Sequence, residues 1–361
     1  MKKVIVQFII LSFGLILFSA CSANQNEQEQ IIYLDYDPNQ IAQIFTQHIG
    51  GDAKQLTNSE TDILEYTLSI DGSQIAFVVK EGNGGNSIWV LDRDGQSPEK
   101  VRNCPTSICN HLAWHPDGQR LLYEKRPFSA QTRPTIWWVD VTTGETTTVL
   151  SDPNEISSSA VVSPDGQWLS YFSLPTESIQ FVHLATGKRF SVPSTIDSQT
   201  VWHPDRQEAI IRDINVVTYH TDEGDDHTTH DHDFSESLHL FKTDVQTQSR
   251  HLLDETGNAD DGNAAWSPDG EWVAFGRKIS RTNTGRQLWL MRGDGSEAHA
   301  LTDDLQIQHG PSHWSENGRY LLYQKANLAD ADPQPTIWRY DLETNQAEQL
   351  TNSGWFPNWL P

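Results

Sequence analysis

Short apolar stretches alternate with polar turns along most of the chain, and one kind of turn recurs between pairs of apolar stretches. Its fullest form is Ser-Pro-Asp-Gly, as in residues 267–270. Asp-Gly between two alternating apolar runs is a strong β-hairpin signal, because glycine tolerates the positive φ that a tight turn needs. Turns of this type occur at 70–72, 116–118, 164–166, 204–206, 268–270 and 316–318. The pattern predicts an all-β chain built from hairpins.

Each hairpin is followed by a loop and a further apolar stretch, often centred on Trp, and then in several repeats by a short fourth stretch. The third stretches include 88–91, 136–139, 288–291 and 337–340, and the fourth include 55–57, 300–302 and 349–351. Four strands in a repeat of about 45 residues is the size of a β-propeller blade. The repeat therefore predicts a propeller of four-stranded blades.

The two ends of the chain complete one blade between them. First strands are expected near 63–70, 110–116, 159–164, 199–204, 263–268 and 311–316, and a seventh, 355–361, ends the chain without a following turn. Residues 31–36, 42–48 and 54–57 supply three more strands at the other end. We expect the C-terminal strand to join these three, which closes the ring without a free sheet edge. The sequence predicts a seven-bladed propeller over residues 32–361.

The segment Trp266-Ser267-Pro268-Asp269-Gly270 and the residues after it, to Phe275, resemble the repeat of TolB-type β-propellers almost residue for residue. Residues 114–118 are similar, and the resemblance covers 32–361. It implies a propeller without the α/β domain that precedes the propeller in TolB. TolB itself has six blades, so the seven predicted here are a departure from the family.

The N-terminus has the features of an export signal. Met1-Lys2-Lys3 is basic, residues 4–18 are mostly apolar, and small residues precede Cys21. This end resembles the lipobox of bacterial lipoproteins, which implies a signal peptide over 1–20, lipidation of Cys21 and a tether over 21–31. In a cell with two membranes, Ser22 after the cysteine favours attachment of the protein to the outer membrane. In a cell with one membrane, we expect the protein on the cell surface. The alternative is an ordinary signal peptide with an incidental cysteine.

Composition narrows the classes of partner. The chain has 49 acidic and 25 basic residues, for a formal net charge of −24. This charge argues against nucleic acid as a partner. The 13 Trp residues argue against a disordered acidic polymer. We expect an exported, membrane-anchored monomer.

A loop rich in His and Asp makes the fifth repeat longer than the others. Imidazole and carboxylate groups together bind Zn, Mn or similar ions, and Ca is a further candidate. The candidate ligands are His220, His227, His230, His232 and Asp231. The alternative is that the tract stays solvated or chelates metal only weakly.

Basic residues cluster where second strands end and in the loops that follow. They are expected on the same face as the acidic loop, where they reverse the local sign of charge and favour anionic groups such as sugar acids. The candidate ligand-binding residues are Lys125, Arg126, Arg133, Arg277, Lys278, Arg281 and Arg286. The alternative is that these cations serve solubility alone.

Cys104 and Cys109 lie five positions apart between the second and third repeats. An exported compartment is oxidising, so the pair is expected to form a disulfide that closes this short loop. A metal-binding pair is the alternative.

No catalytic motif is recognisable in the sequence. It lacks a Gly-x-Ser-x-Gly elbow, a phosphate-binding glycine loop and a zinc-protease helix. The leading hypothesis is a non-catalytic, lipid-anchored scaffold that holds a protein or glycan of the cell envelope. Seven-bladed oligogalacturonate lyases, which this chain resembles in blade number and repeat type, suggest a metal-dependent polysaccharide lyase as an alternative. Metal handling by the His/Asp-rich loop is the third hypothesis.

Overall fold

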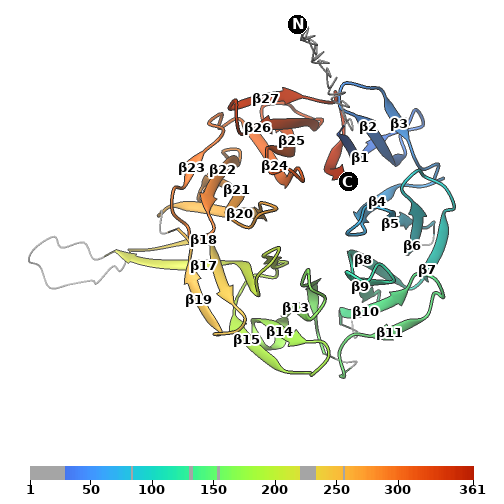
Figure 1. Ribbon diagram of the computed structural model, residues 1–361, viewed down its shortest axis with the longest axis horizontal. Helices are drawn as coiled ribbons and strands as arrows, with labels where there is room; N and C mark the ends of the chain where they lie inside the picture. The colour runs from blue at the N-terminus through green and yellow to red at the C-terminus, as the bar shows by residue number, and fades with distance from the viewer. Residues whose placement is uncertain (1–28, 83, 130–132, 153–154, 220–232, 255–256) are drawn as a thin grey trace, which may run out of the picture.

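Seven four-stranded antiparallel sheets are arranged around a central axis in the computed structural model (Figure 1). The structure describes residues 29–361 except 83, 130–132, 153–154, 220–232 and 255–256. The prediction of an all-β, seven-bladed propeller is confirmed. The described residues contain no helix long and apolar enough to cross a membrane.

The first four blades are as follows, each with its strands given from the central axis outwards. Blade 1 contains β28 (Trp355–Leu360), β1 (Gln30–Tyr36), β2 (Ala42–His48) and β3 (Ala53–Gln55). Blade 2 contains β4 (Ile63–Leu68), β5 (Gln74–Lys80), β6 (Asn86–Asp92) and β7 (Glu99–Cys104). Blade 3 contains β8 (Ser107–Trp114), β9 (Arg120–Pro127), β10 (Thr135–Asp140) and β11 (Thr146–Thr148). Blade 4 contains β12 (Ser158–Val162), β13 (Trp168–Ser173), the 3-10 turn η1 (Leu174–Thr176), β14 (Ser178–His183) and β15 (Arg189–Pro193).

The other three blades follow the same plan. Blade 5 contains β16 (Val201–Trp202), β17 (Glu208–Tyr219), β18 (Asp233–Asp244) and β19 (Ser249–Leu252). Blade 6 contains β20 (Ala259–Trp266), β21 (Trp272–Ile279), β22 (Gln287–Arg292) and β23 (His299–Ala300). Blade 7 contains β24 (Ile307–Trp314), β25 (Tyr320–Asn327), β26 (Thr336–Asp341) and β27 (Gln346–Gln349).

The C-terminal strand closes the ring as predicted. β28 pairs antiparallel with β1, with Leu360 opposite Gln30. Pro361 then reaches blade 2, where Arg93 donates hydrogen bonds to the last two carbonyls. No sheet edge is left open between the first and last parts of the chain.

Tryptophans at one position of the repeat join neighbouring blades. The indole N–H of Trp266 donates to the carbonyl of Val201 at 3.2 Å, and that of Trp314 donates to Ala265 at 3.0 Å. Trp359 closes the series by donating to His313 at 2.9 Å. Each indole thus packs between two sheets and satisfies its polar atom there.

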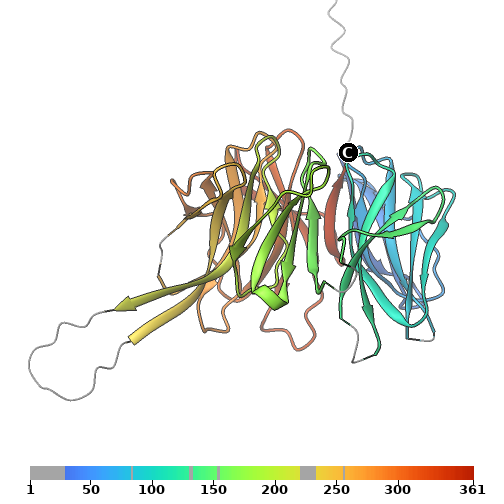
Figure 2. The ribbon, with the colours of Figure 1, turned by 90° about the horizontal axis from the view of Figure 1, so that it is seen from below.

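The disc has two distinct faces. The turns between first and second strands lie on one, which we call the hairpin face, and the loops between second and third strands and between blades lie on the other, the loop face. Figure 2 shows the disc edge-on, with the C-terminus at the hairpin face and β17 and β18 extending away past the loop face. The described part of the chain thus places the variable loops on one side of a rigid ring.

Candidate functional site

β-Bulges interrupt the innermost strands near the loop face. Residues at these bulges hold a left-handed φ, as in His111 at 53°, Ser159 at 53° and Asn263 at 54°. A bulge bends its strand and redirects a side chain. The bulges are at equivalent positions in blades 3, 4 and 6, so different side chains are presented at the same level of the channel wall.

In blade 3 the bulge brings His111 onto a buried carboxylate. His111 Nδ1 lies 3.0 Å from Glu124 Oε2, and the Glu124 side chain is 1% exposed while His111 is 41% exposed. The hydrogen bond from His111 to Glu124 raises the pKa of the imidazole. Glu124 also accepts the backbone N–H of Ser159 in blade 4, at 3.3 Å. An imidazole oriented by a buried carboxylate can exchange a proton or bind a polar ligand.

Glu65 of blade 2 completes this group. Its Oε1 accepts the backbone N–H of Leu112 at 3.2 Å, so it supports the bulge that carries His111. Burial raises the pKa of Glu65. Within the described residues, no three His, Cys, Asp or Glu side chains are grouped so that they could hold a metal ion.

The predicted cations all lie on the loop face, but in two groups on opposite sides of the ring (Figure 1). Lys125, Arg126 and Arg133 belong to blade 3, where Lys125 Nζ lies 5.3 Å from the centre of the Trp137 ring and Arg126 bonds to Glu124. The four others belong to blade 6. These seven cations therefore form two separate groups on the loop face.

In blade 6 the cations differ in what they contact. Arg277 is 5% exposed and bonds to both oxygens of Asp261 at 2.7 Å and to Asp254 at 2.6 Å, which gives it a structural role. Arg286 donates to backbone carbonyls of its own blade. Arg281 is exposed and Lys278 half-buried.

Large exposed apolar side chains gather on the loop face, which the sequence analysis did not foresee. Of the large apolar side chains that are exposed in the described residues, Ile70 lies on the hairpin face. The others lie at strand ends or loops of the loop face, in all seven blades, and we call them the loop-face apolar set: Tyr36, Leu64, Phe128, Leu174, Val216, Ile279, Leu305, Leu328 and Phe356. Apolar residues directly after the last residue of a second strand, as at 128, 174 and 328, were the available signal.

Cys104 and Cys109 form a disulfide at the loop face, with an S–S distance of 1.99 Å and a Cα–Cα distance of 6.2 Å. It joins the last strand of blade 2 to the first of blade 3. The Asn86 side chain exchanges two hydrogen bonds of 2.9 Å with the Cys109 backbone. The predicted lipidation site Cys21 and the predicted metal ligands His220, His227, His230, Asp231 and His232 lie outside the described residues.

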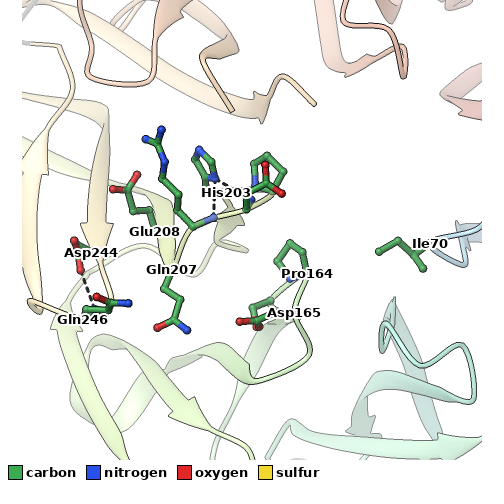
Figure 3. Close-up of a pocket in the computed structure, with 12 residues that line it drawn as sticks. Ile70, Pro164, Asp165, His203, Gln207, Glu208, Asp244 and Gln246 are labelled. Carbon is green, nitrogen blue, oxygen red and sulfur yellow. Dashed lines mark hydrogen bonds between the residues drawn. The ribbon is translucent and has the colours of Figure 1, made fainter. Parts of the chain in front are cut away.

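A cavity of about 780 Å³ opens on the hairpin face, where residues of blades 4 and 5 and Ile70 of blade 2 line it (Figure 3). Carboxylates of Asp165, Asp205, Glu208 and Asp244 line it. His203 is 2% exposed, accepts two backbone N–H groups at Nδ1 and donates from Nε2 to the Gly270 carbonyl at 3.2 Å. Burial lowers its pKa. Both ring nitrogens are used within the fold, so this His is a structural residue.

No family model matches the chain. Over 104 residues it is 33% identical to the uncharacterized protein YidR of Escherichia coli (strain K12), a match that covers 28% of this chain and 23% of that protein. The chain therefore spans about a quarter of the length of that relative.

Solved structures share the fold at low sequence identity. TolB from Acinetobacter baumannii has a TM-score of 0.53 at 16% identity, over 92% of this chain and 67% of that one. An oligogalacturonate lyase in complex with manganese has 0.52 at 17%, over 80% and 73%. A puromycin hydrolase S511A mutant complexed with PGG has 0.65 at 10%, over 90% and 52%. The described chain thus has the TolB-like propeller fold, and these likenesses concern the fold alone.

Proposed function

We propose that this protein is a lipid-anchored, cell-envelope β-propeller that holds a protein partner on its loop face and catalyses no reaction. The observation that carries the proposal is the loop-face apolar set. Phe128 is 52% and Leu174 53% exposed, and comparable side chains occur in every blade of the same face. Nine of the ten large apolar side chains that are exposed in the described residues lie on this one face, and this uneven distribution favours the loop face as a protein-binding site.

Charge indicates the kind of partner. The chain as a whole is strongly acidic, at −24, yet Arg126 of blade 3 and Arg281 of blade 6 each stand two positions in the sequence from a member of the loop-face apolar set, Phe128 and Ile279. A docking surface usually combines an apolar centre with a polar, charge-complementary rim. The expected partner is therefore an envelope protein with an apolar contact surface and acidic residues at its edge.

Photo-crosslinking in intact envelopes tests the proposal. A photoreactive residue is placed at Phe128, at Leu328, or at Ile70, which is exposed and apolar but lies on the hairpin face. We expect a discrete adduct of one mass from the two loop-face positions and none from position 70. The adduct from position 128 should disappear when Leu328→Ser is added, because the two side chains contribute to one surface.

Two results would contradict the scaffold proposal. Equal crosslinking from both faces would remove the loop face as the docking surface. Release of unsaturated uronates from polygalacturonate by the purified full chain, with a bound ion lost in a variant carrying His227→Ala, His230→Ala and His232→Ala, would establish a metal-dependent lyase instead. A bound ion without turnover would favour metal handling.

A further inference from the structure

Two arginines from neighbouring blades converge beside Gly262. A Cβ atom at Gly262 would lie 3.3 Å from Arg212 Nη1 and 3.6 Å from Arg286 Nη1. Arg212 comes from β17 of blade 5, and Arg286 stands directly before β22 of blade 6. Because residue 262 has no side chain, both guanidinium groups can approach its backbone, and they share the space that a side chain would fill.

Arg286 is held firmly in this position. Its Nη1 donates to the carbonyls of Asp260 at 2.7 Å and Gly276 at 2.8 Å. Its aliphatic chain lies over Gly276, where a Cβ would be 2.3 Å from Arg286 Cδ. A guanidinium with fixed backbone contacts keeps its other N–H groups pointing in set directions.

Neighbouring carboxylates are committed to other groups. Asp261 bonds through both oxygens to Arg277, and Asp260 Oδ1 accepts the Leu238 N–H and the Ser280 hydroxyl, each at 3.1 Å. Asp213, next to Arg212 in the chain, pairs with Arg250 at 2.8 Å. Neither Arg212 nor Arg286 forms an ion pair among the described residues.

Arg212 and Arg286 bring two positive charges close together beside Gly262. Burial, and after it the charge of Arg212, lower the pKa of Arg286, and the charges of Asp261 and Asp260 oppose this shift only in part. Arg212 Nε is buried and has no hydrogen-bond partner among the described residues. Two adjacent like charges and a buried hydrogen-bond donor without an acceptor lower the stability of a folded protein. A bound anion removes both effects, because it pairs with the charges and accepts the hydrogen bond.

We propose that Arg212 and Arg286 form a binding site for a compact oxyanion, a carboxylate or a phosphoryl group, between blades 5 and 6. Guanidinium groups bind such planar or tetrahedral oxyanions through paired N–H···O bonds. The oxyanion would bridge the two arginines and accept the free N–H of Arg212 Nε. This site does not depend on the proposed protein partner, because it requires only a small anion.

Thermal unfolding of the detergent-solubilised full chain tests the site, at constant ionic strength with chloride as the reference anion. The probes are inorganic phosphate and glucuronate, which distinguish a phosphoryl from a carboxylate ligand. We expect one of them to raise Tm in a saturable manner, since a ligand that binds only the folded state stabilises it. Arg212→Gln should weaken the binding of that anion about tenfold or more, which is the usual effect of losing charge-assisted hydrogen bonds.

Arg212→Gln also has a signature in the absence of ligand. Because the Arg212 side chain meets a like charge and has no ion-pair partner among the described residues, its removal should leave Tm in chloride unchanged or higher. A lost response to the anion then cannot be attributed to misfolding. Gly262→Ala, which places a methyl group in the shared space, should weaken the same response. Arg206→Gln is the matched control, since Arg206 lies on the hairpin face and 3.9 Å from Glu271. A wild-type Tm that does not respond to either anion, or a response retained in Arg212→Gln, would overturn the proposal.

Discussion

A histidine ring and a glycine from different blades fit against each other at the hairpin face. Gly270 has a φ of 70°, and a Cβ there would lie 2.3 Å from His203 Cε1. His203 donates to the Gly270 carbonyl, so the close approach is also a hydrogen bond between blades 5 and 6. The Asp-Gly turn signal predicted the positive φ, but it did not predict this second requirement, because the neighbouring blade is distant in sequence.

Gly270→Ala should therefore destabilise the protein more than Gly318→Ala does. Gly318 has a φ of 71°, but the nearest atom to its added Cβ is 3.9 Å away. An alanine in the left-handed region lowers the free energy of unfolding by roughly 1–2 kcal/mol in both variants. Gly270→Ala should lower it by about 1–3 kcal/mol more, because the added methyl group overpacks against His203. Urea unfolding measures the difference. In a His203→Ala background the cost of Gly270→Ala should fall to that of Gly318→Ala, and an unchanged cost would rule out the contact as its cause.

At the scale of the element, the turn and strand pattern was predictable because its signals are local. Asp-Gly turns and alternating apolar runs located the hairpins of blades 2, 3, 4 and 6, and the turn Asn317-Gly318 located that of blade 7. The ends of the chain indicated closure by β28. Blade 5 departs most from the common blade plan, because its first strand is only Val201–Trp202 while β17 and β18 are long. The bulges were not predictable, because they arise from packing between blades and have no fixed sequence signature.

The bulge in β8 makes a prediction about pH. The hydrogen bond to Glu124 raises the pKa of His111, so the charged imidazole stabilises the fold fully below its unfolded pKa of about 6.5. That contribution is lost as pH rises through the higher folded value. His111→Gln should therefore cost more stability at about pH 5.5 than at about pH 8.5, as measured by urea midpoints.

His251→Gln is the control for this measurement, because His251 is exposed on an outer strand of blade 5. We expect its effect to change little between the two pH values. If His111→Gln shows the same small dependence as His251→Gln, the Glu124 contact does not favour the charged imidazole in solution.

At the scale of the whole molecule, the candidate sites depend on contacts that the sequence does not display. Residues 277 and 286 looked alike as basic residues near a strand end, yet Arg277 is neutralised by Asp254 and Asp261 while Arg286 faces Arg212. Which cation is paired is decided by carboxylates from other strands. Likewise, Phe128 and Leu328 lie on one face only because the ring places the second strands of blades 3 and 7 in the same direction.

The direction of chain entry predicts how the disc is oriented on a membrane. Gln30 lies on the hairpin face, where Glu29, Gln30 and His48 line a cavity of about 650 Å³ together with the turn residues Glu316 and Asn317. The nine peptide bonds from Cys21 to Gln30 span at most roughly 30 Å when the chain is extended. An anchor at Cys21, as proposed, would therefore hold the hairpin face towards the bilayer and leave the loop face free for a partner.

Lipid-borne quenchers in vesicles carrying the full chain measure this orientation. A fluorophore is attached to a cysteine at Ile70 or at Phe128, which are both exposed apolar positions, at 66% and 52%, on opposite faces. We expect stronger quenching at position 70, because the hairpin face lies nearer the lipid, and little at position 128. A Cys21→Ser chain, which lacks the lipid, should show no difference between the two positions. Equal quenching in the lipidated protein, or stronger quenching at 128, would mean that the loop face is not directed away from the membrane.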